Sequence, residues 1–174
     1  MLITDQLTPH FRASELAEGR ERLPDDPALC ANLAKLAATV LEPLRVDWEA
    51  HIREDNLGGM PSINVVDGYR SPAENARVGG AQQSQHMLGC AADICADVHM
   101  AALREGIGTA RDARRMQDFV TFVERWARTH PAVGGLGIYS EQATGQLYWA
   151  HVDIRPRVNG HLAVWTGHHQ GSEQ

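Results

Sequence analysis

Two residues with good metal-binding side chains, His86 and Asp93, lie seven positions apart near the middle of the chain. Gly89, where the chain can turn, lies between them, and Asp93 belongs to the apolar stretch 91–96. If that stretch is a strand, the histidine at its entrance and the aspartate on it can point at one spot. Imidazole nitrogen and carboxylate oxygen are both good zinc donors. The spacing therefore indicates a pair of ligands for one metal ion.

A third donor is expected on a second, neighbouring strand. Residues 149–154 alternate apolar and polar side chains, which places His151 and Asp153 on the same face of that strand. Three protein ligands with one open position are typical of a catalytic zinc site. Zinc in such a site acidifies a bound water and polarises a carbonyl. The residues alone would thus suit one catalytic zinc ion.

The spacing leaves structural explanations open. A lone buried histidine is often a hydrogen-bonded residue of the core, and Asp93 could simply cap a turn. Several other histidines have no partner at ligand spacing, and we interpret them as structural or surface residues: His99, His130, His161, His168 and His169.

A longer motif surrounds these residues. It comprises Asp67-Gly68-Tyr69-Arg70-Ser71-Pro72, Asn75, Val78-Gly79-Gly80, Ser84-Gln85-His86, Gly89, Ala92-Asp93 and, later, His151-Val152-Asp153. Over residues 60–155 the chain resembles the zinc D-alanyl-D-alanine carboxypeptidases of peptidase family M15. It is similar in particular to the subgroup that contains bacteriophage and prophage cell-wall peptidases, whose N-termini the segment 7–11 also resembles.

The resemblance implies a role for each matching residue. It assigns one zinc ion to His86, Asp93 and His151. It implies that Arg70 binds substrate and steadies the developing oxyanion, which suits a guanidinium because its charge is permanent and its donors are fixed. Arg70 could instead form a surface ion pair. Ser84 is expected to bind substrate or orient His86, or to be a plain turn residue.

One departure from the family pattern concerns the general base. Many members carry an acidic residue or a histidine two or three positions before the last zinc ligand. Tyr148 and Trp149 hold those positions here, and neither is a base at neutral pH. Asp153 is the replacement candidate, although it could also support a ligand or replace His151 as one. Asp67 is a further candidate for supporting a ligand.

These roles predict a zinc metallopeptidase that hydrolyses an amide bond in peptidoglycan stem peptides by attack of zinc-bound water. The sequence does not distinguish a D,D-carboxypeptidase from an endopeptidase. The missing upstream base motivates an alternative, a catalytically weak or inactive zinc module that binds wall peptide or a partner protein. A zinc-free structural domain is the third hypothesis.

The elements that must position these residues follow from apolar periodicity and turn residues. We expect a helix from 27 to about 50, capped by Asp25 or Asp26 and interrupted at Pro43. A short helix should follow Ser71, with Glu74 completing its cap. The remaining expected elements are strands at 63–66 and 91–96, a helix over 111–130, and a hairpin of 136–139 with 147–154. This order predicts an α+β fold with a small antiparallel sheet flanked by helices.

The chain of 174 residues fits a single domain. We expect a lead-in over 1–25 with one short helix, a zinc peptidase domain over 26–167 and a disordered tail over 168–174. The three cysteines, Cys30, Cys90 and Cys95, lack the spacing of a disulfide framework or a zinc knuckle.

Charge and hydropathy restrict the partners. Sixteen basic and twenty-two acidic residues give a net charge of -6, which argues against broad binding to nucleic acid or anionic membrane. The chain has no run of 18 apolar residues and no N-terminal secretory signal, so we expect no membrane span and synthesis in a cytoplasm. Action on the cell wall would follow release, as for a phage lysis enzyme, and we expect a monomer.

Overall fold

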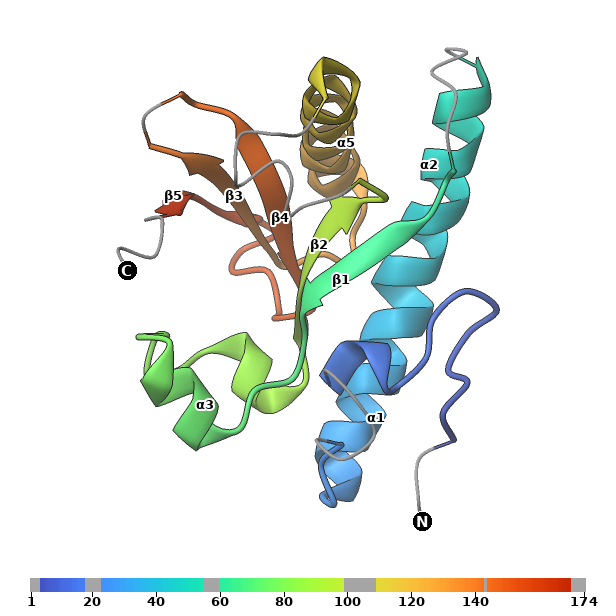
Figure 1. Cartoon of the computed structure of the whole chain (residues 1–174). Helices are drawn as coiled ribbons and strands as arrows, with labels where there is room; N and C mark the ends of the chain where they lie inside the picture. Colours follow the sequence, from blue (N-terminus) through green and yellow to red (C-terminus); the bar gives the residue numbers. More distant parts are fainter. Residues whose placement is uncertain (1–3, 18–22, 55–59, 99–108, 143, 170–174) are drawn as a thin grey trace.

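A sheet of five strands forms the centre of the computed structural model, which describes residues 4–17, 23–54, 60–98, 109–142 and 144–169 (Figure 1). The strands are β1 (Ile63–Asp67), β2 (Ala91–Ala96), β3 (Gly135–Glu141), β4 (Leu147–Asp153) and β5 (Ala163–His169). Their spatial order is β1-β2-β4-β3-β5, and all neighbours are antiparallel except β3 and β5. With the helices, this mostly antiparallel sheet confirms the predicted α+β class.

One long helical run follows the N-terminal segment, in three parts: α1 (Pro27–Leu36), a π-helical turn η3 (Ala37–Leu41) and α2 (Glu42–Glu54). Asp26 caps its start by accepting a hydrogen bond from Ala28 N at 2.8 Å. The sequence predicted an interruption at Pro43, and the structure has the π turn just before it. Proline lacks the N–H that an α-helix needs there and its ring crowds the preceding turn, so a locally wider turn lets the helix continue.

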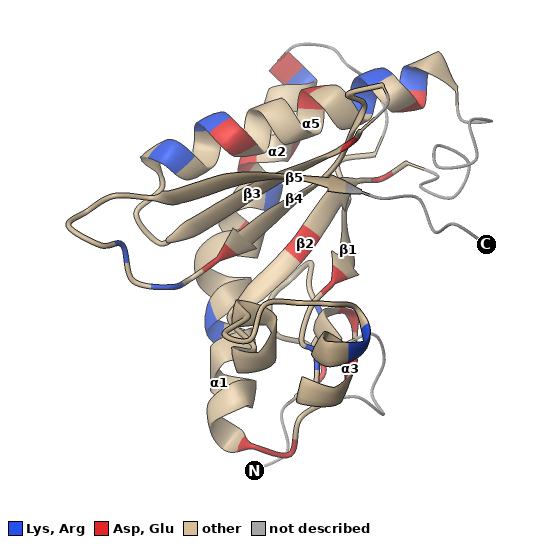
Figure 2. Ribbon diagram, turned by 90° about the vertical axis from the view of Figure 1, so that its left-hand side faces the viewer, with Lys and Arg blue, Asp and Glu red and all other residues tan. Residues whose placement is uncertain are grey.

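Helix α5 (Ala110–Thr129) covers one face of the sheet. It packs against β2, β3 and β4 and touches α2, while α3 lies on the opposite side of the sheet (Figure 2). Its buried stripe is Met116, Phe119, Val120, Val123 and Ala127. Each fully buried large apolar side chain contributes roughly 1.5–3 kcal/mol to folding. The ring of Phe119 meets that of Trp48 on α2 edge-on, with centroids 5.2 Å apart.

The strand register places a row of residues across the other face of the sheet. Asp67 on β1 pairs with Asp93 on β2, and Asp93 pairs with His151 on β4. His151 pairs in turn with Gly137 on β3, and Gly137 with Trp165 on β5. Because side chains alternate along a strand, Ala150 and Val152 on β4 turn instead into the core, where α5 packs.

Two short helices connect β1 to β2. Helix α3 (Pro72–Arg77) starts at Ser71, which forms the predicted capping box with Glu74. The 3₁₀ helix η4 (Gln85–Leu88) follows and leads into β2.

The N-terminal segment packs on the same core as the rest of the domain. The segment predicted as a lead-in contains the short 3₁₀ helix η1 (Glu15–Ala17). Phe11 and Leu16 are fully buried in the core cluster that includes the sheet. The backbone of Leu16 also accepts a hydrogen bond from Tyr69 N at 2.6 Å, just after β1. Core packing and this backbone hydrogen bond therefore join the segment 4–17 to the chain just after β1.

The C-terminal region differs from the expectation. Strand β5 was not predicted, and it continues through His169, two residues into the expected disordered tail. Residues 170–174 lie outside the described residues. The sequence Ala-Val-Trp-Thr-Gly-His-His shows no clear apolar alternation, because an edge strand with two partly exposed faces needs none. Among the described helices, none is both long and apolar enough to cross a membrane.

Candidate metal centre

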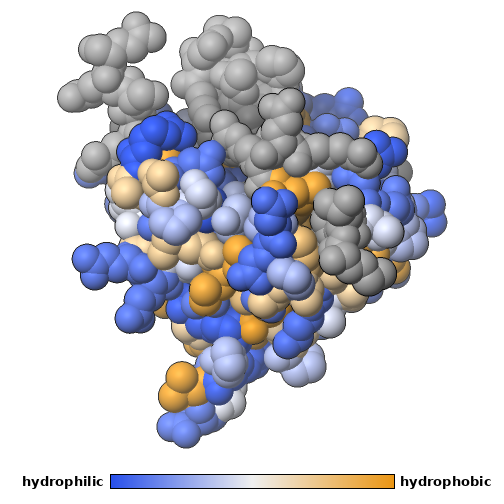
Figure 3. Space-filling model, turned by 90° about the horizontal axis from the view of Figure 1, so that it is seen from below, coloured by the Kyte–Doolittle hydropathy of each residue, from blue (hydrophilic) through white to orange (hydrophobic). Residues whose placement is uncertain are grey.

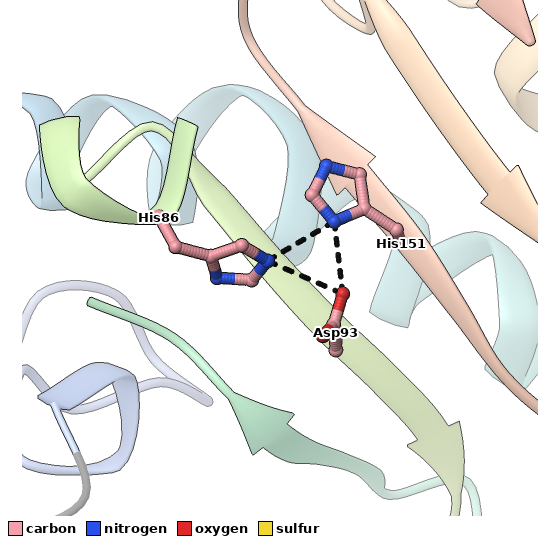
Figure 4. Close-up of side chains that lie close together, drawn as sticks. All are labelled: His86, Asp93 and His151. Carbon is pink, nitrogen blue, oxygen red and sulfur yellow. Dashed lines mark hydrogen bonds and ion pairs between the residues drawn. The ribbon is translucent and has the colours of Figure 1, made fainter. Parts of the chain in front are cut away.

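Three buried side chains from separate elements converge on one point (Figure 4). His86 comes from η4, Asp93 from β2 and His151 from β4. His86 Nε2 lies 3.1 Å from His151 Nδ1, and Asp93 Oδ1 lies 2.8 Å from His151 Nδ1 and 3.4 Å from His86 Nε2. The structure therefore brings together the three residues that the sequence predicted as ligands.

The outer nitrogen of each histidine is already engaged. His86 Nδ1 lies 2.6 Å from the carbonyl oxygen of Gly68, and His151 Nε2 lies 3.1 Å from Asp153 Oδ2. Both partners are acceptors when Asp153 is ionised, so the outer nitrogens carry the protons and donate. The inner nitrogens, which lie next to Asp93, are then the ones that can hold either a proton shared with its carboxylate or, through their lone pairs, a metal ion. This is the arrangement by which proteins orient metal-binding histidines.

The donor set fits zinc. It offers two imidazole nitrogens and one carboxylate oxygen, the ligand types zinc prefers. Three donors about 2.1 Å from a tetrahedral ion are roughly 3.4 Å from one another. The observed separations of 2.8, 3.1 and 3.4 Å are close to that spacing, so the side chains could hold an ion after small shifts.

The protonation preferences of the site point the same way. Burial alone would raise the pKa of Asp93, but hydrogen bonds with His151 and His86 hold it well below its usual range. Burial likewise opposes a charge on His151, yet its hydrogen bonds with Asp153 and Asp93 raise its pKa. The centre thus has an ionised carboxylate and favours positive charge beside it, which either a proton or a metal cation can supply.

A capped turn places His86. Ser84 begins η4, and its hydroxyl accepts a hydrogen bond from the backbone N–H of His86 at 3.3 Å. Gly89 ends η4 in the left-handed region, at φ 64°, and sends the chain into β2. Ser84, predicted to contact substrate or orient His86, therefore contacts the backbone of that residue.

Arg70 lies beside the three residues. Its Nη2 is 3.3 Å from Asp93 Oδ2, the oxygen that does not face the histidines, and its Nε is 2.5 Å from Asp67 Oδ2. Its side chain is 16% exposed, so the guanidinium is held between two carboxylates but still reaches the surface. Burial raises the pKa of Asp67 even though Arg70 is beside it. Asp67, a candidate for supporting a ligand, thus contacts the site through Arg70.

Asp153 lies on the far side of His151. Its side chain is fully buried, and its oxygens contact His151 Nε2 and the Nε and Nη2 atoms of Arg155, at 2.6–3.1 Å. Burial opposes its charge, but the hydrogen bonds from His151 and Arg155 lower its pKa. Gly135 on β3 provides the room, because a Cβ there would collide with this carboxylate. The carboxylate is thus placed against the outer nitrogen of His151, away from His86 and Asp93.

Sequence reasoning missed two residues of this region, Arg155 and Trp165. Arg155 could have been found, because it lies two residues after Asp153, just past the end of β4, and carries the charge opposite to that of the carboxylate. Trp165 had no such signal, since β5 itself was not predicted. Elsewhere in the described residues, His130 stacks on Trp126 with ring centroids 4.1 Å apart. His99 lies outside the described residues.

Residues 29–130 match the family model described as Peptidase M15. The chain belongs to the peptidase M15 family. The matched range covers more than half of the chain and contains His86 and Asp93, whereas His151 lies beyond it and joins them through the pairing of β4 with β2. M15 peptidases depend on a metal, typically zinc, and the His-Asp-His group is where an M15 chain of this fold could hold it. No curated protein matches this chain.

Proposed function

We propose that this M15 protein is a zinc metallopeptidase that hydrolyses an amide bond in peptidoglycan stem peptides. The proposal extends the family assignment to a substrate and names His86, Asp93 and His151 as the ligands of one zinc ion. The observation that supports it most strongly is the pairing of each outer histidine nitrogen with an acceptor. Gly68 O and Asp153 hold the rings so that both inner nitrogens face Asp93 Oδ1.

Zinc in this centre would supply Lewis acidity toward water and toward the scissile carbonyl oxygen. The chain's own residues supply position and charge. Asp93 uses one oxygen for the histidines and the other for Arg70, which fixes the guanidinium next to the centre. A permanent cation there can bind a substrate carboxylate or stabilise negative charge that develops on the carbonyl oxygen. We therefore assign Arg70 to substrate binding and charge stabilisation.

We propose that Asp153 orients His151 and does not remove a proton from water. A general base must lie within hydrogen-bond reach of the proton that it accepts. Asp153 instead contacts the outer nitrogen of His151, and Arg155 donates to both of its oxygens. An ionised carboxylate in that place fixes the tautomer and direction of the ring. The group that removes the proton is then a different one.

A weak or inactive zinc module remains the second candidate, because specific residues favour it. The positions where many M15 members carry a base are occupied by Tyr148, which is 3% exposed, and by Trp149, which stacks on Tyr139 with ring centroids 5.2 Å apart. Such a module would bind wall peptide or a partner protein without cleaving it. Membership of the bacteriophage and prophage subgroup, with release to the cell wall after cytoplasmic synthesis, is part of the first proposal.

Mass spectrometry of peptidoglycan digests separates the two functions. Purified protein loaded with zinc is incubated with isolated cell walls and with a synthetic pentapeptide ending in D-Ala-D-Ala. Release of D-alanine would identify a carboxypeptidase, and release of stem-peptide fragments from the walls would identify an endopeptidase. A chelator-treated sample and the His86→Ala variant are the controls, and both should release nothing. A zinc-loaded protein that binds the walls yet releases no product would support the module.

A further inference from the structure

Trp165 reaches the candidate metal centre from the far edge of the sheet. It lies on β5, two strands away from His151, and Gly137 on β3 stands between them in the same row. A Cβ at position 137 would lie 2.6 Å from Trp165 Nε1, so the indole crosses directly over this glycine. Its ring then meets that of His151, with centroids 5.0 Å apart and planes tilted by 54°. The absent side chain at 137 is what allows this contact.

Arg155 links the indole to the same ligand by a second route. Its guanidinium carbon lies 5.3 Å from the centroid of the Trp165 ring. The same guanidinium donates to Asp153, whose Oδ2 contacts His151 Nε2. His151, Asp153, Arg155 and Trp165 therefore form a closed circuit of contacts. Trp165 Nε1 also donates to the hydroxyl of Tyr139 at 3.1 Å, which fixes the rotation of the indole.

These contacts restrain the His151 ring in two respects. Asp153 determines which ring nitrogen carries the proton, and Trp165 packs against the imidazole from the side of β3 and β5. With both contacts in place, the ring keeps the orientation in which its Nδ1 atom faces His86 and Asp93. Groups that hydrogen-bond a ligand histidine, as Asp153 does here, typically change metal affinity by about 10–100-fold when they are removed, and Trp165 reaches that group through Arg155.

We infer that Trp165 is a positioning residue for the metal ligand His151, coupled to it through packing over Gly137 and through Arg155. The inference rests on the proposed metal site and assigns part of that site to β5. This strand lies outside the residues 29–130 that match the family model. Strand β5 thus helps to position a metal ligand and also forms an edge of the sheet.

Zinc binding by the full-length chain tests this inference. Trp165→Leu removes the aromatic contact, and Gly137→Ala displaces the indole without changing it. Trp165→Phe keeps a ring beside His151. Thr166→Ala is the matched control, since Thr166 is exposed on the same strand and its side chain alternates to the other face. Zinc affinity is measured by chelator competition, ligand geometry by the visible spectrum of the cobalt(II)-substituted protein, and stability by denaturant unfolding with and without zinc.

We expect Trp165→Leu and Gly137→Ala each to weaken zinc binding by about tenfold and to alter the cobalt(II) spectrum. Trp165→Phe and Thr166→Ala should stay close to the unsubstituted protein. The stabilisation that saturating zinc confers should fall by about 1.4 kcal/mol in the first two variants, since it follows the logarithm of affinity.

Two results would overturn the inference in distinguishable ways. If Trp165→Leu lowers the stability of the apo- and zinc-loaded protein equally and leaves zinc affinity and the cobalt(II) spectrum unchanged, Trp165 is only structural and the metal site stands. If the unsubstituted protein binds no zinc, both the inference and the proposed function are wrong.

Discussion

The two ring nitrogens of His151 face different neighbours, and this division determines what the residues around it can do. Nδ1 faces Asp93 and His86, whereas Nε2 faces Asp153. The sequence could place Asp153 on the same strand face as His151, but strand alternation does not say which nitrogen a neighbour contacts. For that reason Asp153 could be predicted as a group near the site, while its contact with the outer nitrogen required the structure.

Substitution of Asp153 by asparagine distinguishes an orienting carboxylate from a general base. The side chain keeps its size but loses the charge that fixes the His151 tautomer and pairs with Arg155. We expect zinc affinity to fall by about tenfold or more, as for other groups that hold a ligand histidine. Chelator competition measures this directly. Zinc affinity equal to that of the unsubstituted protein, combined with loss of turnover, would instead assign the general-base role to Asp153.

At the scale of elements, the sequence predicted those parts that leave a local pattern of apolar or capping residues in the chain. Strand β2, the capping box of α3 and the long helix α5 were confirmed, because the chain shows a continuous apolar run, a pair of cap residues and an apolar period at these three places. The π turn before Pro43 and the edge strand β5 have no such pattern. The carbonyl of Gly68, which binds His86, could not be predicted either, since any residue offers a backbone carbonyl.

The turn that carries His86 predicts a local stability effect. Gly89 has φ 64°, and a Cβ there would lie 3.0 Å from the carbonyl oxygen of Leu29 on α1. Gly89→Ala should lower the free energy of unfolding by more than the roughly 1–2 kcal/mol that the left-handed conformation alone costs an alanine. Urea unfolding measures the change.

Gly160→Ala is the matched control for this turn. Gly160 has φ 77°, and nothing lies within 4 Å of a Cβ built there, so only the conformational cost should appear. Equal losses in the two variants would show that the contact between η4 and α1 does not hold the turn.

At the scale of the whole molecule, the fold does not depend on the metal centre for its core. The core cluster joins the N-terminal residues Phe11 and Leu16 with α1, α2, α5 and the sheet. The candidate ligands Asp93 and His151 lie on the opposite sheet face, and His86 reaches them from η4. The face seen from below is mostly hydrophilic, with hydrophobic residues in small groups near its middle (Figure 3).

Metal removal should therefore lower stability without unfolding the chain. At a free zinc concentration about one hundred times the dissociation constant, binding stabilises the folded state by roughly 2.7 kcal/mol. For a chain of this length that corresponds to a melting temperature higher by about 5–10 °C. Calorimetry with and without a chelator checks this. A chelated protein that no longer unfolds cooperatively would show that the metal, and not the core, holds the fold together.

Anomalous diffraction at the zinc absorption edge, from crystals grown with zinc, tests the central claim most directly. The account predicts one peak per chain at about 2.0–2.2 Å from each of His86 Nε2, Asp93 and His151 Nδ1. A peak bonded to His151 Nε2, or no peak among these three side chains at full zinc loading, would contradict it.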